Sequence, residues 1–386
     1  MALAAASALS TFDQAQGEYL DLSNELAEII RRDNTSFLTR VGISGEATET
    51  LHSWMEDSLN PNTAITLATA DGVLADGTDT TLTVASGQGP RFRAGTLFKD
   101  KAAGKSEVMQ VTDVSGDVLT IVRGYGSTSG ETHGSGTTAF NILIIAHTRQ
   151  DDQDPPSDES KARTKISNYT QIFQRGISVS YSMRAVLQAG VADEYTLQVA
   201  RRLMEIMREL DSSVINGISS GSQGSDTVYR SMGGLIEFSS QAGGNVTTTT
   251  EALTLSVVND MAKQIWDDGG VPNFILVGGK QKRAINVFDQ SARRMAYDAN
   301  AAGYLVDKVI TDLGFILDVI VDPWMADDQC VVGDLGKIRV MPLRSSAMRA
   351  EDLAKTGMAN KGQVCGEYTA EFRNAKEAFA FHSNLT

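Results

Sequence analysis

The stretch NYTQIFQRGISVS, residues 168–180, decides the fold of this chain. Its apolar and polar side chains alternate, and in an extended backbone successive side chains point to opposite faces. One face carries Tyr169, Phe173, Ile177 and Val179, with Tyr181 just beyond the stretch, and the other carries Thr170, Gln174, Ser178 and Ser180. This pattern predicts one β-strand of a sheet that is packed on one side only. A charged run at residues 151–159 (DDQDPPSDE) precedes the strand and predicts a solvated loop.

The strongest helical pattern follows, from about Asp193 to Asn216. Its apolar residues recur every three or four positions, which predicts a continuous apolar stripe on one helix face. Asp193 is a start signal, and Asn216 with Gly217 is a stop signal. At 1.5 Å per residue the helix would be on the order of 35 Å long. The stripe consists of Tyr195, Val199, Leu203, Ile206, Met207, Leu210 and Val214.

Residues 254–385 alternate helical and strand-like segments, which predicts an α/β arrangement. Residues 254–270 predict a helix whose inward residues are Val258, Met261, Ile265 and Trp266. The C-terminal residues 362–385 predict two strands divided by a turn at Asn374-Ala375. The segments between are a buried strand in PNFILVGG (272–279), a helix in KQKRAINVFDQ (280–290), and three strands in FILDVIVDPWM (315–325) and CVVGDLGKIRVMPLR (330–344).

Residues 62–148 have a different texture, with short strand-like pieces separated by Gly, Ser, Thr and Asp. The segment VTDVSGDVLTIV (111–122) predicts a hairpin that reverses at Ser115-Gly116. No helical pattern interrupts these pieces, so the segment predicts a small all-β barrel or sandwich inserted into a longer loop.

The N-terminal residues 1–59 predict an arm rather than a domain. Residues 19–33 (YLDLSNELAEIIRRD) place leucines and isoleucines on one helical face, and residues 34–59 predict an extended, turning segment. The opening MALAAASALS lacks a basic region and makes a poor signal peptide, so we expect the protein to be made and used in a cytoplasm. No apolar window is long enough to span a bilayer.

Composition limits the function. The 386 residues are 41% hydrophobic and 21% charged, which indicates folded domains rather than wholesale disorder. A formal net charge of −14 argues against a nucleic-acid-binding surface, which would need Lys and Arg against phosphates. The two cysteines, Cys330 and Cys365, exclude a disulfide framework.

No group of residues predicts a reactive centre. The four histidines, His52, His133, His147 and His382, stand in separate segments, and no nucleophile, zinc or phosphate-binding motif is present. The Gly-rich segments LVGGKQKR and RGYGSTSG have the wrong spacing or context for a phosphate or dinucleotide site. We therefore expect no enzyme, no cofactor and no metal site.

Five strings, in this order, resemble the major capsid proteins of tailed phages, which have the Hong Kong ninety-seven fold. They are DLSNELAEIIRRDNTSFLTRVG (21–42), LHSWMEDSL (51–59), NYTQIFQRGISVS (168–180), PNFILVGGKQKRAINVF (272–288) and GEYTAEFRNAKEAFAFHSNL (366–385). The resemblance covers residues 18–59 and 165–386. The β-rich segment 62–148 departs from the simple hairpin tip of the family.

The resemblance implies an α+β fold with the parts of a phage capsid protein. These are an N-terminal arm (1–40), an E-loop hairpin (41–61 and 149–180) carrying the inserted β module (62–148), a P-domain (181–250 and 346–386) with a spine helix at 193–216, and an A-domain (251–345). Trp54, Phe173 and Arg175 are the candidate subunit-interface residues.

The resemblance also implies a function. Copies of the chain would assemble into hexamers and pentamers of an icosahedral head, which encloses double-stranded DNA without binding it specifically. Scaffolding, portal and decoration proteins are the other expected partners, no membrane is expected, and assembly would occur in the cytoplasm of the host bacterium. Two alternatives stay open: an encapsulin-like nanocompartment shell, and a β-rich adhesion or carbohydrate-binding protein.

Overall fold

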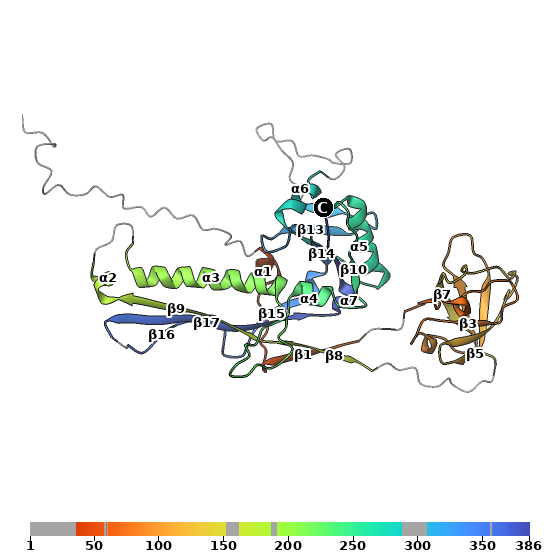
Figure 1. Ribbon diagram of the computed structural model, residues 1–386, viewed down its shortest axis with the longest axis horizontal. Helices are drawn as coiled ribbons and strands as arrows, with labels where there is room; N and C mark the ends of the chain where they lie inside the picture. Colours follow the sequence, from red (N-terminus) through yellow and green to blue (C-terminus); the bar gives the residue numbers. More distant parts are fainter. Residues whose placement is uncertain are drawn as a thin grey trace, which may run out of the picture. The chain divides into compact units, whose positions relative to one another are not determined.

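The computed structural model describes residues 36–57, 59, 61–151, 162–186, 191–287, 307–355 and 357–386. The chain divides into two compact units, drawn in Figure 1. We call Met1–Trp54 with Lys165–Thr386 the main unit, and Met55–Thr164 the barrel unit. The predicted helix at 19–33 and all of the charged run after Asp151 lie outside the described residues.

The long predicted helix is present in the main unit as α3 (Glu194–Asn216), and it lies along β9 and β17 (Figure 1). Asp193 caps its start by accepting a hydrogen bond from the Thr196 N–H, and the Gly217 N–H donates to the Ser213 carbonyl at its end. The predicted stripe is confirmed except at Leu203, which is 41% exposed; Tyr195 and Val199 are partly buried against the core, and full burial begins at Ile206. The second half of α3 is therefore the more deeply packed part.

The predicted strand 168–180 is two strands with different partners. β8 (Thr164–Tyr169) pairs with β1 (Leu51–Glu56), whereas β9 (Gln171–Ser180) pairs antiparallel with β17 (Ala359–Phe372). The break falls at Thr170, whose N–H donates to the Thr50 carbonyl at 2.9 Å.

The predicted alternation is confirmed within β9. Phe173, Ile177 and Val179 are buried, and the residues between them are exposed. Tyr181 is an exception to the prediction, because it begins the short helix α2 (Tyr181–Ala185) instead of extending the strand.

β17 is the centre of the sheet beneath α3. Its other edge pairs with β15 (Ile338–Pro342) and β16 (Arg349–Asp352). The chain after helix α1 (Ser36–Val41) runs beside this sheet, where Ile43 and Ala47 form parallel bridges to Val340 and Leu343.

A second sheet of the main unit has six strands. In spatial order they are β10 (Asn245–Thr247), β18 (Phe379–His382), β14 (Cys330–Gly333), β11 (Phe274–Val277), β13 (Ile316–Val321) and β12 (Lys308–Ile310). Helix α5 (Leu255–Asp267) packs on β14 and β18, and α6 (Gly279–Ile285) follows β11. The predicted inward position of Trp266 was wrong, because this side chain is 52% exposed.

Alternating residues of the central strands enter two separate cores. Ile275 and Val277 pack with α5, whereas Phe274 and Leu276 face the core that also contains helix α4 (Leu235–Ser239). The predicted turn at Asn374-Ala375 is confirmed: Asn374 has a left-handed backbone (φ 48°), and helix α7 (Ala375–Ala378) leads into β18.

The barrel unit confirms the predicted all-β insertion. Its strands are β2 (Thr63–Ile65), β7 (Asn141–His147), β4 (Thr96–Asp100), β5 (Val108–Ser115), β6 (Val118–Val122) and β3 (Thr81–Thr83), in spatial order, with every pair antiparallel. A bridge between Thr66 and Val84 joins the two edge strands, so the sheet closes into a barrel. The predicted hairpin is confirmed between β5 and β6, where Gly116 has a φ of 61°.

Candidate functional site

Two of the three candidate interface residues are buried inside the main unit. The Trp54 ring is 7% exposed and lies 5.9 Å from the Phe238 ring, measured between centroids. The Phe173 ring is 3% exposed and lies 6.4 Å from the Tyr368 ring. Both rings hold their strands on the core of their own chain, and their interface role stays a prediction.

The third candidate, Arg175, is accessible. Its guanidinium forms an ion pair with Glu209 on α3, and both side chains are about two-fifths exposed (43% and 40%). They line a shallow groove between β9 and α3. An exposed pair of this kind contributes little to stability, so Arg175 is free to exchange partners.

A buried pair of carboxyl groups anchors the start of the described chain. Asp211 on α3 and Asp322 after β13 are both fully buried. The Leu38 N–H donates to Asp211 at 2.8 Å, and the Phe37 N–H donates to Asp322 at 3.4 Å. Burial, followed by the charge of Asp322, raises the pKa of Asp211 to about 8.

Asp211 was missed by the sequence reasoning, although it left a signal. It follows Leu210 on the buried face of α3, where burial of a carboxyl group is costly unless the group has a partner. Its partner lies 111 residues away, so no local pattern could have named Asp322.

The barrel unit encloses a network of charged side chains. His133 is fully buried, with Nδ1 3.0 Å from Asp100 and Nε2 2.9 Å from Glu107. Arg123 donates two hydrogen bonds to Glu107, at 2.8 and 2.7 Å. Burial alone would raise the pKa of Glu107, but the hydrogen bonds from Arg123, the Glu131 N–H and His133 lower it to about 2. The arrangement joins two carboxyl groups to the Arg123 guanidinium and the His133 ring, and it is complete without a ligand.

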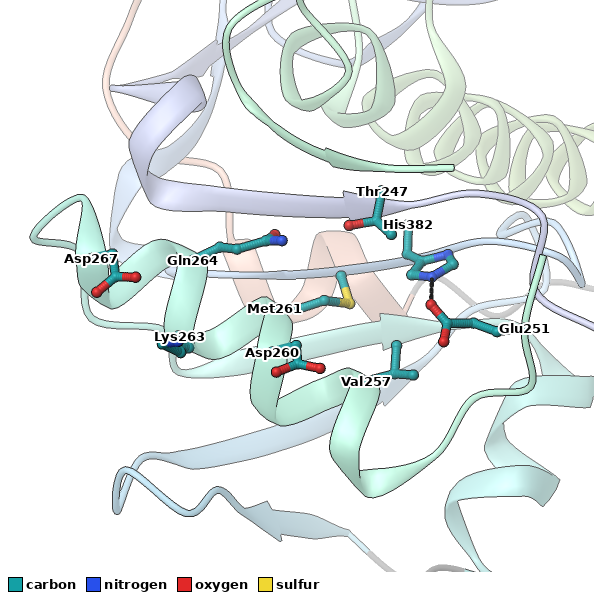
Figure 2. A pocket seen from close by; sticks show the side chains of 9 residues that line it. All are labelled: Thr247, Glu251, Val257, Asp260, Met261, Lys263, Gln264, Asp267 and His382. Atoms are coloured by element: carbon teal, nitrogen blue, oxygen red, sulfur yellow. Dashed lines mark hydrogen bonds and ion pairs between the residues drawn. The ribbon is translucent and has the colours of Figure 1, made fainter. Parts of the chain in front are cut away.

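A pocket of about 310 Å³ lies beside α5, where β10 and β18 form one edge of the six-stranded sheet (Figure 2). His382 forms its inner wall, with Nε2 3.0 Å from Glu251 and Nδ1 2.7 Å from the Ser383 carbonyl. Asp260, Gln264 and Asp267 of α5 line the other side. Both ring nitrogens of His382 therefore lie within hydrogen-bond distance of an oxygen atom of the chain itself, as expected of a structural group.

The described residues present no reactive centre. Burial raises the pKa of the Cys330 thiol to about 12, so this cysteine is an inert apolar side chain. Among the residues that the structure describes, no three His, Cys, Asp or Glu side chains gather as metal ligands. None of the described helices combines the length and hydropathy that a bilayer span requires.

Comparisons with known proteins identify a family and a fold for the chain. A family model described as SU10 major capsid protein matches residues 7–386. No curated protein matches. The capsid of a native GTA particle is 11% identical, with a TM-score of 0.53, and the match covers 98% of this chain and 100% of that chain. A structure from Microbacterium phage Oxtober96 is 12% identical, with a TM-score of 0.50, covering 97% of this chain and 98% of that chain.

An encapsulin complex from Synechococcus elongatus is 12% identical, with a TM-score of 0.42, and covers 57% of this chain and 76% of that chain. The two full-length similarities show the expected α+β capsid fold.

Proposed function

We propose, from the premise that this chain belongs to the SU10 major capsid protein family, that its copies form the hexameric and pentameric rings of an icosahedral head. The protein is a tailed-phage major capsid protein, and its copies associate into a shell. We further propose that the head encloses double-stranded DNA, that scaffolding, portal and decoration proteins join it, and that assembly takes place in the cytoplasm of a bacterial host.

The family match over residues 7–386 carries this proposal. It favours a phage capsid over both alternatives, the encapsulin-like nanocompartment and the adhesion or carbohydrate-binding protein. The proposal also includes that the protein has no enzymatic activity, which the lack of a reactive centre among the described residues supports.

The surface of the main unit supports ring formation. Several large apolar side chains are exposed on it, and such side chains mark a contact surface where they adjoin one another. The most exposed are Tyr229 (95%), Met358 (78%), Ile218 (71%), Val287 (67%) and Ile310 (67%).

We assign the parts of the chain according to the domain layout expected of a phage capsid protein. Residues 1–40 are the N-terminal arm, 41–61 with 149–180 the E-loop, 62–148 the insertion, 181–250 with 346–386 the P-domain, and 251–345 the A-domain. The paired strands β1 and β8 and the long helix α3 support the E-loop and the spine helix. β18 is shared, because it lies in the P-domain range and adds to the sheet of β11 and β14.

For the interface residues we propose that β1 and β9 face a neighbouring copy. Arg175 would make the contact, and the buried rings of Trp54 and Phe173 would hold the two strands in position for it.

DNA confinement without specific binding fits the charge of the chain. A net charge of −14 repels the phosphate backbone, so that packaged DNA can also leave. The inner surface of the shell would then confine the DNA without binding it specifically.

Sedimentation velocity and negative-stain electron microscopy of the purified full-length chain test the proposed function. We expect rings, sheets or closed shells. A stable monomer at every salt concentration, with and without a co-expressed scaffold, would overturn the proposal.

A further inference from the structure

The α5 pocket is a surface of unused acceptors. The Oε1 atom of Gln264 is buried and has no hydrogen-bond partner among the described residues. Asp260 and Asp267, one turn before and one turn after it, make no ion pair within the described chain, and Figure 2 shows all three lining the pocket. Lys263 of α5 also lines the pocket and forms no ion pair with either carboxylate. A buried acceptor without a donor destabilises the folded chain, so a donor from outside would be favoured here.

The acceptors define the chemistry of that donor. His382 cannot supply it, because both of its ring nitrogens are already engaged. Two carboxylates around one amide oxygen favour a cation with several N–H groups, and a guanidinium carries five in a planar fork. The pocket therefore fits an arginine side chain, with a lysine as a weaker substitute.

Helix α6, which packs on the same face of the sheet as α5, carries such groups. Lys280 and Arg283 lie three residues apart on α6, which places them on one helix face, and both are exposed. Neither forms an ion pair with a described residue. Lys282, between them, instead lies 4.0 Å from Asp307, just before the edge strand β12. α6 thus stands near the β12 edge, whereas the pocket opens at the β10 edge.

We propose that, in each ring of the shell, the α5 pocket of one copy binds Arg283 of the neighbouring copy, with Lys280 beside it. The pairing rests on the proposed ring assembly and names one contact within it. A closed ring needs two different surfaces on each copy, one for each neighbour, and opposite edges of one sheet are such a pair.

Exposed apolar side chains lie on both edges of the sheet. Ile310 and Ile316 are directly opposite each other on β12 and β13 and are 67% and 54% exposed. Beside the pocket, Val246 on β10 is 37% exposed.

Charge reversal on each side tests the contact. One variant carries Asp260→Lys and Asp267→Lys, a second carries Lys280→Glu and Arg283→Glu, and a third carries all four changes. We expect the first two to need a protein concentration at least about tenfold higher for ring formation, and the third to recover assembly. The control, Asp71→Lys with Asp113→Lys on the exposed surface of the barrel unit, adds the same charge as the first variant and should assemble normally.

Mixing the two one-sided variants gives a sharper result. The first variant has a reversed pocket and a basic α6, and the second has an acidic pocket and a reversed α6. Opposite charges therefore meet at every contact only where the two variants alternate around a ring. Alternation closes in a hexamer and cannot close in a pentamer. Mass photometry and electron microscopy of the mixture should therefore show hexamers without pentamers.

Normal assembly of both one-sided variants would overturn the pairing, and so would failure of both the fourfold variant and the mixture. Circular dichroism checks that each variant folds. If a reversed variant unfolds, Asp260→Asn with Asp267→Asn decides: unchanged assembly overturns the pairing, and a tenfold loss supports it. A wild-type chain that stays monomeric overturns the proposed function and this contact with it, whereas wild-type rings combined with normal reversed variants overturn the contact alone.

Discussion

At the residue scale, buried ionisable side chains determine how particular segments of the chain are held in place. Asp211 is tolerated in the core because it can hold a proton beside Asp322, and Glu107 is tolerated because Arg123 and His133 meet it. Each group accepts hydrogen bonds from backbone N–H groups of a segment that is distant in the sequence. Asp211 holds α1, and Glu107 holds the loops around Gly124 and Glu131. Breaking such a group is costly because its partner is left buried and alone.

Asp211→Asn should flatten the pH dependence of the main unit. The pKa of Asp211 is about 8 in the folded chain, above its usual value, so the folded state favours the protonated form. Its stabilising effect is complete below about pH 4 and is lost as the pH rises through 8, by up to about 1.4 kcal/mol per pH unit. Asparagine keeps the donor and cannot ionise.

Urea denaturation between pH 5 and 9, followed by tryptophan fluorescence, measures this effect, because Trp54, Trp266 and Trp324 are the three tryptophans of the chain and all lie in the main unit. The matched control is Asp226→Asn at an exposed position. Equal slopes for wild type and Asp211→Asn would contradict the assignment.

Glu107→Gln should destabilise the barrel unit by about 3–5 kcal/mol, because it leaves Arg123 and His133 without their common carboxylate. The pKa of Glu107 is lowered to about 2, so its contribution is present above about pH 4.5 and is lost as the pH falls toward 2. Hydrogen exchange read by mass spectrometry over residues 106–133 should show faster exchange in the variant at pH 7. Unchanged exchange, as expected for the control Asp113→Asn, would mean that the network contributes no net stability.

At the scale of elements, the helix α3 and the strand break at Thr170 organise the main unit. α3 is held by its second half, and its first half lies half-exposed over the sheet. At Thr170 the chain leaves one strand partner and takes another, while the Thr170 carbonyl accepts a hydrogen bond from Arg230 at 2.8 Å. Because a change of partner leaves backbone groups unpaired, such side-chain hydrogen bonds are needed at the junction.

A pair of leucines on α3 tests which half is packed. Leu210→Ala should lower the free energy of unfolding of the main unit by about 2–5 kcal/mol, because Leu210 is fully buried. Leu203→Ala, with the side chain 41% exposed, should cost less than about 1 kcal/mol. Urea titrations by tryptophan fluorescence give both values, and equal costs would show that the first half of α3 is also packed.

At the scale of the whole molecule, the chain consists of two compact units, the main unit with two hydrophobic cores and the barrel unit with one. The barrel has its own apolar cluster, which includes Phe98, Met109 and Ile142, and its sheet closes on itself. The main unit keeps its strands β1 and β8 paired at the point where the chain enters and leaves the barrel. The two units therefore meet the physical requirements for independent folding.

Deleting residues 62–148 should leave the main unit folded. Its urea midpoint by tryptophan fluorescence should change by no more than the equivalent of about 0.5 kcal/mol, since no residue of its two cores is removed. A chain of residues 55–164 alone should show a cooperative thermal transition in circular dichroism. Global unfolding of the deletion variant would mean that the barrel is an integral part of the main unit.

The sequence alone determined the local elements, the β insertion and the family. Periodicity of two in β9, periodicity of 3.6 in α5 and the second half of α3, and the Gly-containing turn at Gly116 are local effects, and local effects are written in consecutive residues. It could not determine that Trp266 and Leu203 lie outward, that β8 and β9 part at Thr170, or that Asp211 meets Asp322. These features depend on contacts between segments that lie far apart in the sequence. The tertiary structure decided them, because burial and pairing are properties of the assembled core and not of any one segment.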